Sequence, residues 1–140
     1  MHFLTFVAAL AGIAPAAPDP DTIPLYDDLG THHHEITTDV PLAQAYFDQG
    51  MRLTYAFNHQ EAVASFRYAA ELDPSCAMCW WGVALALGPN ITAPMAQPEA
   101  LAAYEAIRGA QAALDAESAR ERAYVAARRR PPSTPTASGP

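Results

Sequence analysis

Apolar residues recur three and four positions apart through most of residues 39–130, and short polar or proline-containing breaks interrupt them. Positions at this spacing fall on one face of an α-helix, so each run predicts an amphipathic helix. The pattern therefore predicts an all-α fold, in which consecutive helices pair antiparallel across short turns. We expect helices over about 41–57, 60–72, 75–88, 98–114 and 119–129.

Local signals mark where these helices begin and end. Pro74 follows Asp73 and ends the second helix, because proline lacks an N–H and disfavours helical geometry in the residue before it. Pro98 is harmless in the first turn of the fourth helix. Ser118 and Glu121 have the spacing of a capping box, which predicts the start of the fifth helix.

A repeat of about 34 residues lies within the helical pattern. The positions that carry it are Tyr46, Gly50, Ala62, Phe66, Ala69, Pro74 and Trp80. Ala62 and Ala69 are small where two helices must approach closely, and Phe66 fills the space between them. The spacing resembles that of the tetratricopeptide repeat. The resemblance implies a short solenoid of antiparallel helix pairs that presents a groove to a protein or peptide partner.

The repeat recurs in weaker form downstream. The segment 61–66 is echoed by 99–104, with an insertion of about four residues in the turn around 88–94. The segments 29–31, 88–90 and 121–124 resemble the opening part of longer exported bacterial tetratricopeptide proteins, and the resemblance covers most of residues 26–127. It suggests that the chain is a fragment or a prematurely ended version, so we expect either self-association or further repeats missing from this chain. Two alternatives are a helical bundle with this spacing by accident and a helical segment that completes a larger enzyme or assembly.

In tetratricopeptide proteins the first helix of each pair lines the groove. Carried over by position, the resemblance implies a partner-binding surface made of Gln44, Phe47, Met51, Thr54, Tyr55, Met78, Trp81 and Leu85. Aromatic and methionine side chains suit adaptable peptide contacts. The alternative is that several of these residues are core beneath the segment that precedes the helices.

Cys76 and Cys79 stand three residues apart at the start of the third helix. This places them on one face, within reach of a local disulfide or of one soft metal ion. Buried free thiols are a further alternative. Covalent haem attachment is excluded because Trp80, and not histidine, follows the second cysteine.

Histidines offer a second candidate site. In an extended segment His32 and His34 point the same way and could share a copper or zinc ion, which His59 and the pair Cys76 and Cys79 could complete. The alternative is that this polar histidine run is solvated or hydrogen-bonded locally. We expect no cofactor unless this metal site forms.

Composition limits the remaining classes of function. The chain has 140 residues, which suits one domain, and a net charge of −7 with all 8 basic side chains being arginine. Nucleic-acid binding is disfavoured because no basic face runs along the helices. No nucleophile elbow or phosphate-binding glycine loop occurs, so we expect a binding protein and not an enzyme.

The two ends of the chain lack the helical pattern of its centre. Residues 1–16 predict a signal peptide with an apolar stretch that is too short to span a bilayer, so we expect no membrane contact beyond export. Residues 17–38 predict an extended lead segment, 39–130 the helical domain and 131–140 a disordered tail. The expected location is periplasmic or extracellular.

Overall fold

The computed structural model describes residues 23–89, 96–114 and 118–128, and the predicted signal peptide and tail lie outside these ranges. The described residues form five α-helices and no strand, so the predicted all-α fold is confirmed. The helices are α1 (Pro41–Tyr55), α2 (His59–Leu72), α3 (Ala77–Ala86), α4 (Gln97–Ala112) and α5 (Ala119–Ala127). Within the described ranges, no helix combines the length and the apolar character that a membrane span needs.

The helix ends follow most of the local signals. Pro41 occupies the first turn of α1, although the residue that caps this helix is Val40, which offers no side-chain hydrogen bond. The predicted capping box at the start of α5 is confirmed, since Ser118 and Glu121 bond to each other's backbone amides. Between α1 and α2 the chain reverses at Phe57, which takes up a left-handed φ of 60°.

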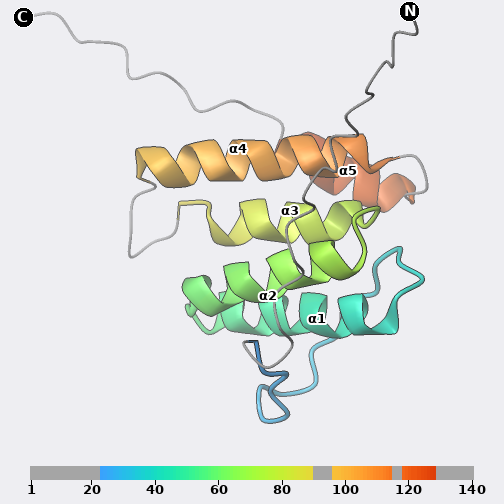
Figure 1. Ribbon diagram of the computed structural model, residues 1–140, viewed down its shortest axis with the longest axis vertical. Coiled ribbons are helices and arrows are strands. Elements are labelled where there is room, and N and C mark those ends of the chain that lie inside the picture. The colour runs from blue at the N-terminus through green and yellow to red at the C-terminus, as the bar shows by residue number, and fades with distance from the viewer. Residues whose placement is uncertain (1–22, 90–95, 115–117, 129–140) are drawn as a thin grey trace, which may run out of the picture.

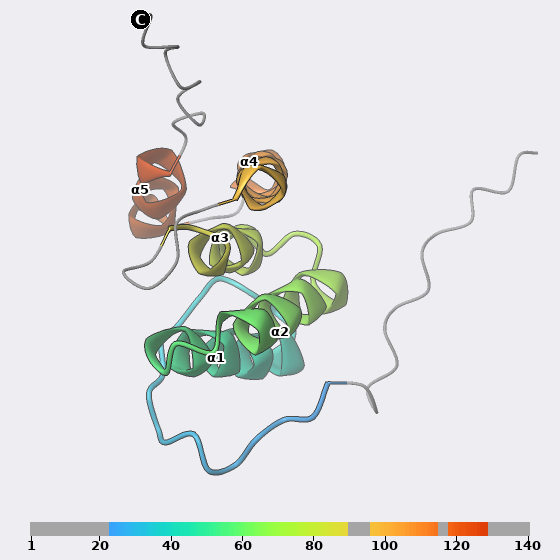
Figure 2. The same ribbon diagram turned by 90° about the vertical axis from the view of Figure 1, so that its left-hand side faces the viewer.

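Each helix packs on the next along the chain, as Figure 1 shows for α1 to α4. The short turns between α1 and α2 and between α2 and α3 make these neighbours antiparallel. In Figure 2, where several helices are seen end on, α3 lies between the pair α1 and α2 below and the pair α4 and α5 above. α3 also contacts α1 on one side and α5 on the other, so α1, α3 and α5 follow one another on one side of the stack.

Phe66 is the central side chain of this packing. It lies on α2 with none of its surface exposed, and its ring contacts that of Phe47 on α1 with 5.4 Å between centroids. A Cβ atom placed on Gly50 would lie only 2.6 Å from the Phe66 ring, and one on Gly82 would overlap the same ring. The glycines on α1 and α3 therefore make room for one phenylalanine on α2.

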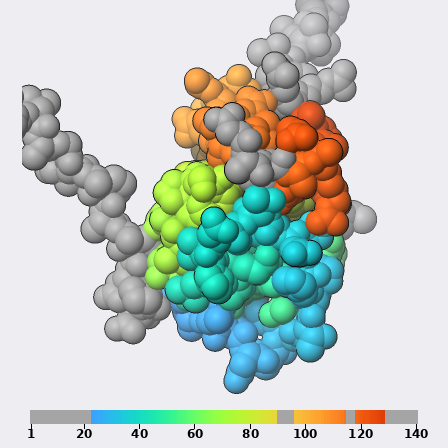
Figure 3. All heavy atoms as spheres, turned by 90° about the vertical axis from the view of Figure 1, so that its right-hand side faces the viewer, coloured from blue at the N-terminus to red at the C-terminus, as the bar shows by residue number. Residues whose placement is uncertain are grey.

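The lead segment, as far as it is described (residues 23–38), is fastened along α1 by side chains of that helix. The Tyr46 hydroxyl donates to the Ile23 carbonyl at 2.8 Å, and the Gln49 side chain accepts from the Tyr26 amide at 2.7 Å. Near its end the segment reaches α5, and Figure 3 shows the blue segment in contact with the orange-red helix. The lead segment thus bridges the first and the last helix.

Candidate functional site

A cavity of about 190 Å³ lies where α1, α3 and α5 meet the lead segment. Its walls come from all four elements. The lining residues are His34 from the lead segment, Met51, Thr54 and Tyr55 from α1, Trp81 and Leu85 from α3, and Tyr124 from α5. Most of this lining is aromatic or aliphatic, so the cavity is suited to an apolar group.

Ring contacts hold the walls of the cavity in place. The rings of Trp81 and Tyr124 lie 5.3 Å apart, and the Trp81 indole N–H donates to the Tyr124 carbonyl at 3.1 Å. His34 packs edge-on against Tyr124 at 5.9 Å, and His32 packs edge-on against Tyr55 at 5.6 Å. Tyr55 itself is 66% exposed, which leaves it free to contact a partner.

His34 is the imidazole of the cavity, and its surroundings favour the uncharged form. Burial lowers the pKa of its imidazole below 6.5, and the positive charge of Arg120 lowers it further, against the opposing effects of Asp48 and Glu121. Its Nε2 atom is buried and has no hydrogen-bond partner among the described residues. A neutral imidazole with an unused nitrogen therefore stands beside the apolar lining.

Asp48 fixes the position of this histidine. Its carboxylate accepts from the His34 backbone amide at 3.0 Å and pairs with the Nδ1 atom of His33 at 2.7 Å. Asp48 is only 6% exposed, and the Gln44 amide also donates to it at 3.2 Å. The lead segment is thus attached to α1 just where it supplies a wall of the cavity.

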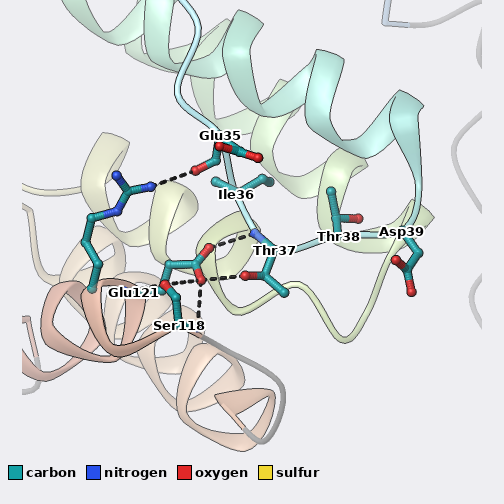
Figure 4. Close-up of a pocket in the computed structure, with 8 residues that line it drawn as sticks. Glu35, Ile36, Thr37, Thr38, Asp39, Ser118 and Glu121 are labelled. Atoms are coloured by element: carbon teal, nitrogen blue, oxygen red, sulfur yellow. Dashed lines mark hydrogen bonds between the residues drawn. The ribbon is translucent and has the colours of Figure 1, made fainter.

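Glu121 makes the matching attachment to α5, which Figure 4 shows in close-up. This carboxylate is 1% exposed and accepts from the Thr37 amide at 2.7 Å and from the Thr37 hydroxyl at 2.6 Å. It also accepts from the Ser118 amide and hydroxyl, so one side chain both caps α5 and holds the lead segment. A polar cleft of about 360 Å³ lies beside this junction, where Arg120 donates to the Glu35 carbonyl at 3.2 Å.

Five of the eight predicted partner-binding residues line the cavity: Met51, Thr54, Tyr55, Trp81 and Leu85. The other three do not, and the prediction needs correcting there. Phe47 and Met78 are 0% and 1% exposed, so they belong to the core. Gln44 holds the lead segment, because its amide accepts from the Ile36 backbone and donates to the His34 carbonyl. The alternative of burial beneath the lead segment fits Phe47, whose ring lies 6.1 Å from that of His34.

Two lining residues were not among the predicted groove residues. Tyr124 lies on α5. The rule that the first helix of each pair lines the groove also covers this fifth helix, so the sequence holds a signal for Tyr124. For His34 the sequence predicts a role as a metal ligand instead. No sequence signal shows that it faces Tyr124, because the two residues are far apart in the chain.

Cys76 and Cys79 are joined in a disulfide, with 5.4 Å between their Cα atoms and neither side chain exposed. Cys76 precedes α3, and its sulfur accepts from the Cys79 amide at 3.0 Å. With their sulfurs bonded to each other, the two cysteines do not act as metal ligands in this state.

The structure does not bring the predicted metal ligands together. Among the described residues, no three side chains of His, Cys, Asp or Glu are placed to hold a metal ion. His32 and His34 pack against Tyr55 and Tyr124, whereas His59 begins α2 and lies near Phe57. Copper or zinc binding remains a prediction from the sequence.

Comparisons of the chain with family models, with curated proteins and with solved structures found no match.

Proposed function

We propose that this chain is a non-catalytic interaction module with a short tetratricopeptide-like solenoid, which binds a peptide segment of a partner protein on the face formed by α1, α3 and α5. The helix contacts support this arrangement: α1 pairs with α2 and α3 with α4, while α3 contacts both α1 and α5. In a solenoid of helix pairs the first helices follow one another in this way and line one surface.

The observation that carries the proposal is the cavity on that surface. Its lining combines rings from three helices with the flexible side chain of Met51. Aromatic and methionine side chains around a recess are typical of positions that anchor a binding partner. The exposed ring of Tyr55 at its border adds contact area that the fold itself does not need.

We further propose that the module acts outside the cytoplasm. The predicted signal peptide is the sequence basis for this location. The disulfide between Cys76 and Cys79 supports it, because disulfides persist in oxidising compartments and are rare in the cytosol.

A peptide-display selection on the full chain tests the function. Peptides selected from a random library are measured against the wild type and against Tyr55→Ala, which removes a cavity residue. Phe57→Ala is the matched control, because Phe57 is 62% exposed against 66% for Tyr55 and does not line the cavity. We expect Tyr55→Ala to weaken binding about fivefold or more and Phe57→Ala to change it less than about twofold. Failure to select any binder, or equal effects of the two variants, would contradict the proposal.

A further inference from the structure

We propose that the partner segment is acidic and carries one bulky apolar residue, which enters the cavity between α1, α3 and α5 while arginines at its border pair with the flanking carboxylates. This inference rests on the proposed peptide-binding function and adds the chemistry of the partner. It is carried by the arginines around the cavity, by what they bond to, and by the size of the cavity.

Three arginines lie near residues that line the cavity, although none of the three lines it itself. The Arg128 guanidinium lies 5.8 Å from the centre of the Trp81 ring. Arg52 donates to the carbonyl of His32, the residue whose ring packs on Tyr55, at 2.9 Å. Arg120 lies on α5 close enough to His34 to affect the imidazole electrostatically. Three positive charges therefore lie near one apolar recess.

No carboxylate within residues 23–89, 96–114 and 118–128 pairs with any of these three charges. Arg52 and Arg120 donate to the backbone carbonyls of His32 and Glu35, and Arg128 donates to that of Ala84 at 3.3 Å. The ion pair that joins His33 to Asp48 involves none of these arginines. A guanidinium has five N–H donors in a planar fork that matches a carboxylate. Each of these three arginines donates one of them to a backbone carbonyl of a described residue, so it has further N–H groups to offer a partner.

Two carboxylates near the cavity, those of Asp48 and Glu121, are already engaged, whereas the exposed residue Glu35, whose carbonyl accepts from Arg120, adds one negative charge beside the polar cleft. Asp48 pairs with His33 and accepts from the His34 amide, and Glu121 accepts four hydrogen bonds from Thr37 and Ser118. Both are held by the lead segment, and Glu121 is held by the start of α5 as well. The three guanidinium groups thus offer N–H donors to the carboxylates of an acidic segment.

The net charge of −7 does not cancel this local attraction. At physiological ionic strength, charges separated by more than about 8 Å are largely screened from one another. A partner at contact distance is therefore governed by the arginines it touches, and the acidic remainder of the surface discourages it from binding elsewhere.

The size of the cavity points to a single inserted side chain. Pockets for drug-sized ligands span roughly 300–1,000 Å³. A volume of about 190 Å³ is smaller and suits one aromatic or aliphatic residue. The buried Nε2 atom of His34 offers the entering segment one hydrogen bond that no described residue uses.

Fluorescence anisotropy with defined peptides tests the inference on the full chain. The labelled probes are a short peptide with phenylalanine flanked by Asp and Glu, the same peptide with alanine for phenylalanine, and the same peptide with Lys and Arg for the acidic residues. We expect the acidic phenylalanine peptide to bind about tenfold tighter than either of the others.

The arginine variants supply the matched controls. Arg52→Gln and Arg120→Gln should each weaken the binding of the acidic phenylalanine peptide about threefold, as expected for partly exposed charge pairs. Arg67→Gln and Arg108→Gln remove exposed arginines from α2 and α4, away from the cavity, and should change binding by less than about 1.5-fold. Thermal unfolding of every variant verifies that the fold is retained.

The outcomes separate the two proposals. If the basic or the alanine peptide binds as tightly as the acidic phenylalanine peptide, or if all four arginine variants act alike, the acidic-partner inference is overturned while peptide binding stands. If display-selected peptides bind the wild type but do not respond to Tyr55→Ala, the proposed binding face itself is wrong and the inference is lost with it.

Discussion

At the scale of single residues, Phe66 determines which side chains its neighbours can have. Gly50 and Gly82 each face its ring at a distance that leaves no room for a Cβ atom. An alanine normally stabilises a helix over glycine by roughly 0.5–1 kcal/mol, whereas overpacking a core costs about 1–3 kcal/mol. At Gly50 and Gly82 the cost of overpacking should exceed the gain in helix stability.

We therefore expect Gly82→Ala to lower the free energy of unfolding by about 1–2 kcal/mol, measured by urea denaturation. The paired variant Phe66→Leu/Gly82→Ala should show a smaller loss relative to Phe66→Leu alone, because the smaller side chain makes room for the new methyl group. A Gly82→Ala protein more stable than the wild type would contradict this packing.

Asp73 gives a second prediction at this scale, from its pKa. Burial alone would raise the pKa of its carboxyl, but hydrogen bonds from Ser75, from Thr38 and from backbone amides hold it below the ordinary 3.8. The ionised group therefore stabilises the fold above this value. That contribution is lost as the pH falls through the lower folded-state pKa, because the unfolded chain takes up its proton first.

The measurement is the free energy of unfolding as a function of pH for the wild type and for Asp73→Asn. We expect the wild type to lose stability more steeply than the variant below about pH 4, since the variant has no carboxyl to titrate at this position. Parallel curves in this acid range would show that the hydrogen bonds to Asp73 do not stabilise the fold.

At the scale of helices and segments, local information was sufficient for some features and not for others. The apolar spacing predicted the five helices, and the capping box at Ser118 was visible because its residues are three positions apart. The same Glu121 also holds Thr37, which is 84 positions away in the sequence. No local pattern reports such a contact, so the path of the lead segment across the helices could not be predicted.

This shared carboxylate makes a testable difference between Glu121 and Glu99, each of which accepts from the amide of the residue that precedes its helix. Glu121 is buried and joins α5 to the lead segment, whereas Glu99 bonds only to the exposed backbone at the start of α4. We expect Glu121→Gln to cost about 2–3 kcal/mol and Glu99→Gln less than about 1 kcal/mol. Amide hydrogen exchange should also accelerate in residues 34–38 with the first variant only. Equal costs and no change in exchange would show that the lead segment is not held by Glu121.

At the scale of the whole molecule, the site depends on elements from both ends of the described chain. The repeat spacing implied eight residues for a groove, and five of them line the cavity. The remaining walls, His34 and Tyr124, are brought in by the lead segment and by α5. Burial of Phe47 and Met78 likewise follows from how the neighbouring elements cover them, which helix periodicity alone does not reveal.

Binding of a peptide on the face formed by α1, α3 and α5 is the central claim, and the two tryptophans of the chain provide its most direct test. The Trp81 indole N–H bonds to the Tyr124 carbonyl beside the cavity, whereas that of neighbouring Trp80 bonds to the Pro74 carbonyl and its ring lies against Gly109. Both indole signals can be followed by NMR on the ¹⁵N-labelled chain while a display-selected peptide is titrated in. We predict that the Trp81 signal shifts saturably and the Trp80 signal stays in place. A saturable shift of Trp80 alone, or binding that moves neither signal, would contradict the claim.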